Sequence, residues 1–129
     1  MHSVSCKTTV GLALALDYFP NARWLVRAVD DTFVYISHLE RELRIFDSRE
    51  KVYVGHAAVS LLCIEPEHAP ACAEVHAGGG GGIVFSRPLA EDIVQHRDVV
   101  LSTAGETNDD LHLGHFLRYA LGVHVQSLP

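Results

Sequence analysis

The chain has 129 residues, of which 48% are hydrophobic and 20% are charged. This composition is typical of a single globular domain that buries a core, and it excludes an intrinsically disordered chain. The formal net charge is -6 and only ten residues are Lys or Arg, which argues against non-specific nucleic-acid binding because neutralising phosphates requires clustered cations. An anionic ligand would therefore have to be held locally, for example through a bound cation.

The first third of the chain predicts a helix, a strand and a second helix. Good helix formers predominate from Thr8 to Phe19, and the apolar run Trp24–Val29 predicts a strand of the kind found in parallel sheets. Hydrophobic residues then recur every three or four positions across Ile36–Phe46, which indicates an amphipathic helix that packs through one face. Ser37 is its expected N-terminal cap.

No segment is expected to enter a membrane. The apolar stretch Val10–Leu16 follows Lys7 and imitates the core of a signal peptide, but Asp17 and Tyr18 interrupt it. No run reaches the roughly 18 apolar residues that a membrane span requires. The chain by itself is therefore expected to be soluble.

The middle of the chain is dominated by the glycine run Gly78–Gly82. Short strands are expected at Val52–Gly55 and Ile83–Ser86, whereas Ala57–Val75 contains two Pro and no sustained period and is expected to be a loop or insertion. A glycine run allows the backbone to approach a ligand closely, but the same composition also occurs in flexible linkers. Both interpretations stay open at this point.

The last third predicts helices and a closing strand. A helix is expected at Pro88–Val94, with proline in its first turn, and a brief strand at Val99–Leu101. A further helix begins after Asn108 and ends at Gly122. A strand at Val123–Leu128 completes a predicted α/β domain.

Two pairs of adjacent carboxylates are the best candidates for chemistry. Asp30 and Asp31 follow the first predicted strand, and such oxygen ligands suit Mg²⁺ or Mn²⁺ with positions left open for diphosphate oxygens. In a turn, however, Asp-Asp-Thr is commonly only a solvated cap. Asp109 and Asp110 are expected to begin a helix. They can act in proton transfer there, or they can simply cap the helix, because the positive end of the helix dipole stabilises negative charge.

Histidine and cysteine give weaker signals. The nine His are scattered without an H-E-x-x-H pattern; His112 and His115 are nearest to a ligand pair, and packing is the simpler interpretation. Cys63 and Cys72 could form a disulfide in an oxidising compartment, although free or buried thiols are simpler. The sequence has no G-x-S-x-G, P-loop or correctly placed G-x-G-x-x-G motif, so hydrolase and dinucleotide-binding functions lose their main support.

Seven short motifs occur in one order across nearly the whole chain, and together they resemble the Fringe family of glycosyltransferases. The motifs are Ser5-Cys6-Lys7, Arg23-Trp24, Val29-Asp30-Asp31-Thr32-Phe33-Val34, Val52-Tyr53-Val54-Gly55, Gly79-Gly80-Gly81-Gly82, Phe85-Ser86-Arg87, and Asn108-Asp109-Asp110 followed by Gly114 and Leu121-Gly122-Val123. This resemblance implies a partial GT-A-like fold, in which helices flank a mixed sheet. It also implies an inverting transferase that uses a UDP-sugar and Mn²⁺ to make β1,3 linkages.

The resemblance implies separate roles for the first pair of carboxylates. The family normally has three consecutive Asp; the last binds the metal and the middle one contacts the sugar nucleotide. These roles fall on Asp31 and Asp30, and Val29 replaces the first Asp. The metal would neutralise the departing UDP.

The glycine run and the second acidic pair also fall on family motifs. Gly79–Gly82 matches the Gly-Gly-Ala-Gly loop that lines the active-site cleft, and Gly79 and Gly80 are the expected donor contacts. Asp109 falls on the catalytic base, which takes a proton from the acceptor hydroxyl. Asp110 takes that role if the register differs by one residue.

Family members commonly carry Cys residues that bridge neighbouring strands, and Val26 and Val84 occupy those positions here. Two apolar residues can pack together in place of the bridge. The family's Cys in Ser-Cys-Lys pairs upstream, and Cys6 has no upstream partner in this chain.

The resemblance covers the central part of the family domain. Residues 1–129 are therefore expected to form a single partial domain without the family's N-terminal βα units, which hold much of the uridine pocket. The family's C-terminal end, where a His completes the metal site, is likewise expected to lie beyond Pro129. The expected location is the Golgi lumen, with an anchor outside this chain.

The leading functional hypothesis is transfer of N-acetylglucosamine to a glycan on a glycoprotein. A β1,3-galactosyltransferase of the same superfamily is an alternative. A non-catalytic domain that keeps the fold to bind a partner or glycan is the main alternative, because of Val29 and the incomplete ends. A His-rich metal-binding protein is disfavoured, since its ligands have no regular spacing.

Overall fold

The computed structural model describes residues 4–61, 73–103 and 109–128, and it describes side chains at residues 6–59, 75–100 and 110–128. The elements are α1 (Val4–Tyr18), β1 (Trp24–Arg27), α2 (Ile36–Leu43), β2 (Tyr53–Gly55), β3 (Ala57–Leu61), β4 (Ala73–Ala77), the 3-10 turn η2 (Gly79–Gly81), β5 (Ile83–Ser86), α3 (Arg87–Gln95), α4 (Arg97–Thr103), α5 (Asp109–Leu121) and β6 (Val125–Gln126). The predicted α/β class is confirmed. None of the described helices is long and apolar enough to span a membrane.

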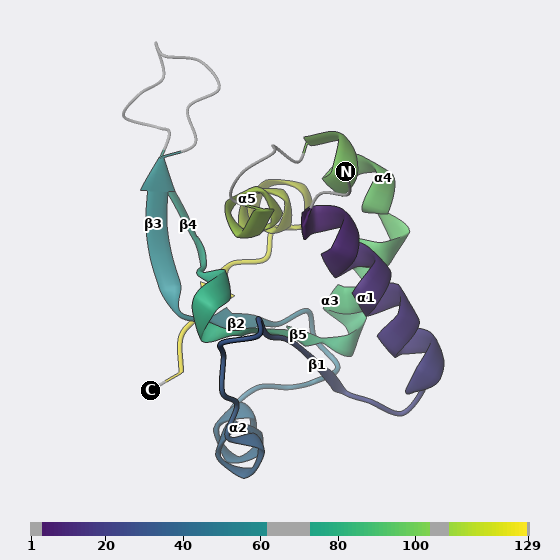
Figure 1. Ribbon diagram of the computed structural model, residues 1–129, viewed down its shortest axis with the longest axis vertical. Coiled ribbons are helices and arrows are strands. Elements are labelled where there is room, and N and C mark those ends of the chain that lie inside the picture. Colours follow the sequence, from purple (N-terminus) through teal and green to yellow (C-terminus); the bar gives the residue numbers. More distant parts are fainter. Residues whose placement is uncertain (1–3, 62–72, 104–108, 129) are drawn as a thin grey trace.

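A four-stranded sheet separates two helical layers (Figure 1). Helix α2 lies on one face of the sheet, and α1, α3 and α5 lie on the other. The strand order is β1-β5-β2-β6, with β5 antiparallel to both of its neighbours and β2 parallel to β6. The sheet is therefore mixed, as the family resemblance implies.

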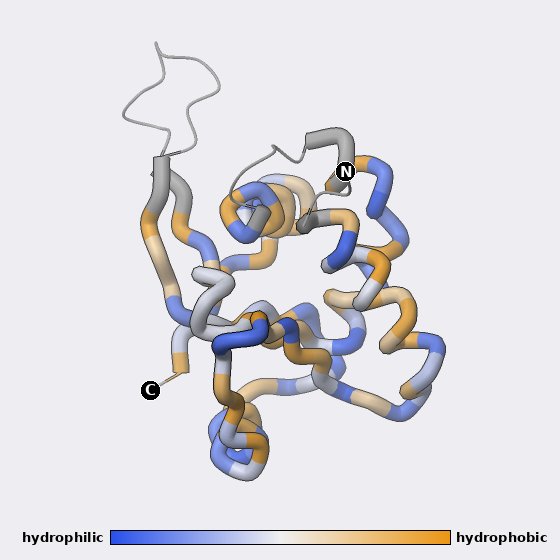
Figure 2. The backbone as a smooth tube through the Cα atoms, in the orientation of Figure 1, coloured by the Kyte–Doolittle hydropathy of each residue, from blue (hydrophilic) through white to orange (hydrophobic). Residues whose placement is uncertain are grey.

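The central strands bury side chains on both faces of the sheet. Tyr53, Ile83 and Phe85 join the larger core beneath α1, α3 and α5, whereas Val54 and Val84 join a smaller cluster against α2. Successive side chains along a strand point to opposite faces, so this division follows from the pleat. Figure 2 shows hydrophobic residues along much of the sheet where it lies between the helical layers.

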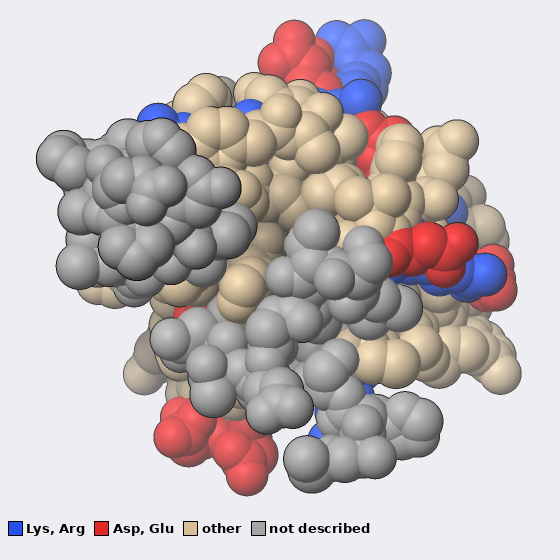
Figure 3. All heavy atoms as spheres, turned by 90° about the horizontal axis from the view of Figure 1, so that it is seen from above, with Lys and Arg blue, Asp and Glu red and all other residues tan. Residues whose placement is uncertain are grey.

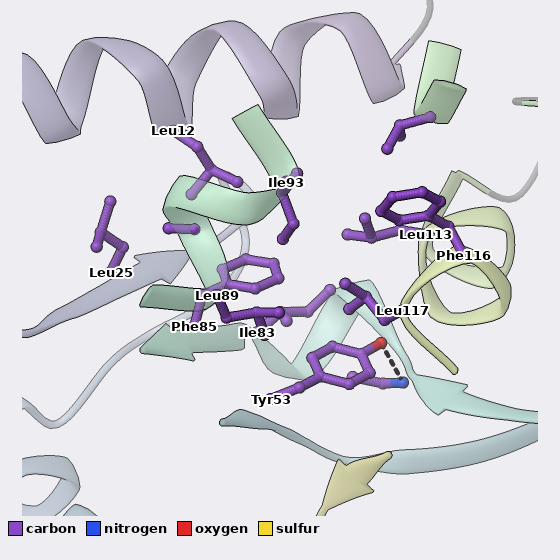
Figure 4. Packing of buried hydrophobic residues seen from close by; sticks show 13 residues of the cluster. Leu12, Leu25, Tyr53, Ile83, Phe85, Leu89, Ile93, Leu113, Phe116 and Leu117 are labelled. Carbon is purple, nitrogen blue, oxygen red and sulfur yellow. Dashed lines mark hydrogen bonds between the residues drawn. The ribbon is translucent and has the colours of Figure 1, made fainter. Parts of the chain in front are cut away.

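The larger core includes Tyr53 and Phe85 (Figure 4). Both side chains are fully buried, and their rings stack with centroids 6.1 Å apart. The Tyr53 hydroxyl accepts a hydrogen bond of 2.8 Å from the Ala77 N–H, which satisfies the buried phenol and joins the main sheet to β4.

Two glycines allow β4 to pack closely against β2 and α5. A Cβ at Gly55 would lie 2.6 Å from the Cβ of Ala77, and a Cβ at Gly114 would lie 2.5 Å from the Cβ of His76. Any side chain at either position would push β4 away. These two motif glycines therefore serve packing.

Strand β1 differs from the prediction, because it is an edge strand antiparallel to β5 and not a strand of parallel type. Its sequence is apolar because both of its faces are partly covered: Leu25 belongs to the larger core, and Trp24 packs against the α2 cluster. Val26 nevertheless remains 42% exposed. An apolar run indicates burial on both faces and not the direction of the neighbouring strand.

The expectation of a loop at Ala57–Val75 is wrong at both ends of that segment. There, β3 and β4 form a two-stranded antiparallel sheet that extends from the main sheet (Figure 1), and β4 also packs against α5. The pattern was weak because Val59 and Val75 point outward, with 69% and 40% of their surface exposed. Cys63 and Cys72 lie outside the described residues.

Two smaller expectations in the helical regions are also wrong. The strand expected at Val99–Leu101 lies within α4, where Val100 is buried and Val99 is exposed. A run of three apolar residues is too short for its period to distinguish a strand from a helix. The N-cap of α2 is Tyr35, which makes no side-chain capping bond, so Ser37 lies inside the helix.

Arg87 joins the β5–α3 junction to the end of α1. Its guanidinium donates hydrogen bonds to the carbonyl oxygens of Leu16, Phe19 and Ala22 at distances of 2.9 to 3.2 Å. The last carbonyls of a helix have no partners within the helix, so a cation with several N–H groups is well suited to them. Arg87 in the Phe85-Ser86-Arg87 motif is therefore a structural residue.

Replacing this cation should destabilise the protein. We expect Arg87→Ala to lower the free energy of unfolding by roughly 2 kcal/mol, because hydrogen bonds to charged groups contribute about 1.5–3 kcal/mol. Thermal and urea denaturation would measure the change. Arg49 provides a matched control, since its side chain is 88% exposed and pairs with Asp47 at the surface; Arg49→Ala should change the free energy of unfolding much less than Arg87→Ala does. Equal losses in the two variants would contradict the capping role.

The strand register places Val26 directly opposite Val84. The Arg87 N–H donates to the Arg23 carbonyl oxygen at 2.9 Å, which identifies residues 23 and 87 as a hydrogen-bonded pair. Pairs alternate along antiparallel strands, so Val26 and Val84 form a non-hydrogen-bonded pair, for which the Cα atoms are typically about 4.5 Å apart. This spacing suits a disulfide. The two positions implied by the family's bridge therefore do face each other.

We expect the double variant Val26→Cys/Val84→Cys to form a disulfide under mild oxidation. Such a cross-link typically stabilises a protein by about 2–4 kcal/mol, so the oxidised variant should melt at a higher temperature than its reduced form. Mass spectrometry and thermal denaturation with and without reductant would test this. The single variants Val26→Cys and Val84→Cys serve as controls, and two thiols that stay reduced in the folded double variant would contradict the register.

Candidate functional site

Asp30 and Asp31 occupy the two central positions of a tight turn that follows β1. The Thr32 N–H donates to the Val29 carbonyl oxygen at 3.0 Å and closes this turn. Both carboxylates belong to exposed residues. We refer to residues 29–32 as the acidic turn. Its local geometry is that of an ordinary solvated turn, so any functional meaning depends on what lies beside it.

The glycine run forms a second tight turn between β4 and β5, and we refer to residues 78–82 as the glycine turn. Gly79–Gly81 adopt a single 3-10 turn, and the Gly82 N–H donates to the Gly79 carbonyl oxygen at 3.1 Å. Gly82 has φ of +86°, which disfavours any other residue. A Cβ at Gly81 would meet only the Cβ of His56 at 3.5 Å, so the Ala of the family loop would also fit there.

The acidic turn and the glycine turn are joined by a hydrogen bond. The Thr32 hydroxyl donates to the Gly80 carbonyl oxygen at 2.9 Å, across 48 positions of sequence. Thr32 also lies near Gly82, where a Cβ would come within 3.8 Å of its methyl group. The structure therefore brings Asp30 and Asp31 to the glycine residues predicted to contact the donor.

The start of α5 meets the same glycine turn from another direction. The Asp110 carboxylate accepts a hydrogen bond from the Gly79 N–H at 2.9 Å. Asp109 precedes it as the first residue of α5, and its side chain lies outside the described part of the structure. The backbone at both acidic pairs therefore lies beside a single glycine turn.

Two further residues at this junction were not singled out from the sequence. A Cβ at Gly79 would lie only 2.8 Å from Nη1 of Arg27, so the guanidinium crosses the glycine turn where a side chain would otherwise be. His76 is 4% exposed, and its Nδ1 lies 4.0 Å from Oδ2 of Asp110 and 3.2 Å from the Ala77 carbonyl oxygen. Arg27 was detectable as the one charged residue of an apolar strand. His76 had no comparable signal.

The carboxylates predicted to bind a metal would leave most of its coordination positions free. Among the described residues, no group of three or more His, Cys, Asp or Glu could hold a metal ion. Two adjacent carboxylates are nevertheless hard oxygen donors, and cations such as Mg²⁺ are commonly held by one or two carboxylates together with substrate phosphates. The chemistry of the acidic turn therefore fits a divalent cation shared with a diphosphate.

The other His pair considered in the sequence lies elsewhere. His115 packs its ring against Tyr119 at a centroid distance of 4.5 Å on α5, and His112 is half-buried one turn earlier. This arrangement agrees with a packing role.

Lys and Arg side chains are dispersed over the face in Figure 3, several beside Asp or Glu, and the described part of that face has no basic patch.

A cavity of about 340 Å³ opens on the side of the glycine turn away from α5. Gly81 and Gly82 form one wall, and the aromatic rings of Phe33 and Tyr35 are part of its lining. These two rings pack edge to face with their centroids 4.8 Å apart, and both residues are largely exposed. The cavity therefore adjoins the glycine turn, and Phe33, which lines it, directly follows the acidic turn in the chain.

Comparison with known proteins agrees with this arrangement of motifs. The family model described as Fringe-like matches residues 1–129. Chondroitin sulfate synthase 3 from Homo sapiens is 28% identical over 107 residues, which cover 78% of this chain and 12% of the human protein. The Mus musculus protein of the same name is also 28% identical over 107 residues, which cover 11% of its length. The chain thus spans only about a tenth of these relatives, and it belongs to the Fringe-like family.

Proposed function

We propose that this domain is part of an inverting glycosyltransferase, which transfers a sugar from a UDP-sugar to a glycan in β1,3 linkage. Membership of the Fringe-like family supports the class of enzyme. The observation that carries the proposal is the junction at the glycine turn, where hydrogen bonds from Gly79 to Asp110 and from Thr32 to Gly80 bring three distant motifs together. A donor, a cation and a base must meet at one place in such a reaction.

In this proposal the acidic turn holds the diphosphate end of the donor. Asp31 would bind Mn²⁺ and Asp30 would contact the sugar nucleotide, and both carboxylates are exposed enough to do so. When bound, the cation neutralises charge that develops on the departing UDP. Gly80 offers bare backbone beside the turn, since a Cβ there would meet nothing within 4 Å. A ligand can therefore approach this backbone closely.

Asp109 is the proposed base. Its carboxylate would accept the proton of the acceptor hydroxyl as that oxygen bonds to the anomeric carbon and the bond from this carbon to the UDP oxygen breaks. The support is its position as the first residue of α5, next to Asp110 and the glycine turn.

The proposals for the sugar and the acceptor rest on the resemblance to the family. N-acetylglucosamine and a glycan on a glycoprotein are the primary proposal, and galactose is the alternative sugar. The relatives are named for chondroitin sulfate synthesis, which favours a growing chondroitin chain as a second candidate acceptor. The Golgi lumen is the proposed location. A non-catalytic domain that binds a glycan or a partner is the alternative function, because Val29 replaces one family carboxylate.

The cavity next to the glycine turn is the proposed position for a sugar ring. The cavity has a volume of about 340 Å³ and a largely apolar lining, to which His38 and His56 add polar groups. These properties are typical of sites for small ligands. Phe33 and Tyr35 would provide aromatic surface for the apolar face of a sugar.

Donor binding can be tested by thermal shift with UDP and Mn²⁺, given separately and together. A ligand that binds only the folded state at 100 times its Kd stabilises that state by about 2.7 kcal/mol, so the two together should raise the melting temperature by several degrees. Asp31→Ala should abolish the shift, whereas Asp17→Ala, an exposed carboxylate on α1, should leave it unchanged. A wild-type chain with no shift would contradict donor binding by this chain.

The base assignment can be tested in the longest form of the protein that transfers sugar. Asp109→Asn should lower the turnover number by about 10²- to 10⁴-fold, the usual contribution of a general base. Binding of UDP and Mn²⁺ should remain. Asp98→Asn is the control, because it makes the same change at an exposed carboxylate on a different helix, α4. Normal turnover by Asp109→Asn would refute the role.

A further inference from the structure

Asp110 points away from solvent and into the junction beneath the glycine turn. Its side chain is 21% exposed. Oδ2 accepts the Gly79 N–H at 2.9 Å, and Oδ1 accepts the N–H of Leu111 at 3.0 Å. Both carboxylate oxygens are therefore engaged by backbone N–H groups. Such contacts hold a carboxylate in place.

The next residue of the glycine turn is held from the opposite side. The Gly80 carbonyl oxygen accepts the hydroxyl of Thr32 at 2.9 Å. The two bonds thus attach adjacent glycines to two different parts of the chain: Gly79 to the start of α5, and Gly80 to the acidic turn. We refer to this pair of bonds as the two-sided tether.

A tether of this kind matters because glycines have no side chains with which to fix their own conformation. Glycine loses more backbone entropy on ordering than any other residue, so a run of five depends on bonds from outside the run. Arg27 limits the same segment sterically, with Nη1 where a Gly79 side chain would lie. The buried His76 lies beside Oδ2 of Asp110, within 4.0 Å.

We propose that Asp110 is a positioning residue and not the base, and that it holds the glycine turn against α5 so that the acidic turn and the proposed base keep a fixed separation. The consequence for catalysis rests on the proposed function; the tether itself does not. In the alternative left open by the sequence, Asp110 takes the proton. Each of its oxygens keeps a second lone pair, but a proton on either oxygen would weaken the bonds from Gly79 and Leu111 that hold the turn, so a tethering role and a base role conflict.

Matched substitutions separate the two roles. Asp110→Asn keeps a carbonyl oxygen that can accept the Gly79 N–H but cannot act as a base, whereas Asp110→Ala removes the acceptor. On the other side, Thr32→Ser keeps the hydroxyl and Thr32→Val removes it with nearly the same shape. Amide hydrogen exchange at Gly79, followed by NMR on the ¹⁵N-labelled chain, reports the tether directly and requires neither donor nor acceptor.

We expect Asp110→Ala to speed exchange at Gly79 by roughly ten- to a hundredfold, in line with the loss of one hydrogen bond to a charged acceptor. Asp110→Asn should restore most of the protection. Thr32→Val should also speed exchange at Gly79, and Thr32→Ser should not, because the two bonds hold one turn. Unchanged Gly79 exchange in a folded Asp110→Ala variant would overturn the tether. If that variant does not fold, unchanged Gly79 exchange in Thr32→Val would overturn it instead.

Activity provides the second readout, in a form of the protein that transfers sugar. A positioning role predicts that Asp110→Asn retains most of the wild-type turnover, whereas Asp110→Ala raises KM for the donor and lowers kcat together. A loss of turnover in Asp110→Asn as large as in Asp109→Asn, with Gly79 protection and donor binding intact, would make Asp110 the base and overturn the proposal. Absence of UDP and Mn²⁺ binding in the wild-type chain would count against the proposed function alone, because the exchange measurement stands without it.

Discussion

Helix α5 lies against β4 at a separation that only glycine at position 114 permits, with the Cβ of His76 where a side chain would be. The Tyr53 hydroxyl holds β4 at the same contact: it accepts the N–H of Ala77 and would lie 3.5 Å from a Cβ at Gly114. The chain passes from Ala77 straight into the glycine turn, so this packing decides where the turn lies relative to the first residues of α5. The contact between Asp110 and Gly79 is a consequence of that close approach.

The position of the acidic turn follows from antiparallel pairing. Because Arg27 pairs with Ile83, the end of β1 lies beside the start of β5, and the residues that follow β1 meet those that precede β5. A site at the carboxyl end of the strand was expected from the rule for parallel sheets. That rule does not apply to β1; the acidic turn lies beside the glycine turn because two loops at one end of an antiparallel pair are neighbours in space.

Elements with a clear period or clear boundaries could be predicted from the sequence. The amphipathic pattern of α2, the proline at the start of α3 and Gly122 after α5, with φ of +68°, are all local signals. Strands β3 and β4 could not be predicted, because Val59 and Val75 are exposed and the strands depend on each other and on α5. A short apolar segment such as α4 is decided by tertiary packing.

The candidate site could likewise be predicted from the sequence only in part. Asp30, Asp31, Gly79 and Gly80 were identified by the order of family motifs, and the structure places them together. The bonds that join the glycine turn to the acidic turn and to α5 cross 48 and 31 positions of sequence, and no local pattern reports such contacts. The opposed positions of Val26 and Val84 could be inferred only because family members mark both with Cys.

Arg87 has a consequence for how the protein opens. The guanidinium of Arg87 donates to carbonyl oxygens at the end of α1 and in the connection to β1. The backbone N–H of the same residue donates to the carbonyl oxygen of Arg23, directly before that strand. Helix end, connection and edge strand are thus fastened to the β5–α3 junction at one residue. Regions coupled in this way tend to open as one cooperative unit. The end of α1 should therefore not fray by itself; its exposure to solvent should coincide with release of β1, the strand that carries the acidic turn.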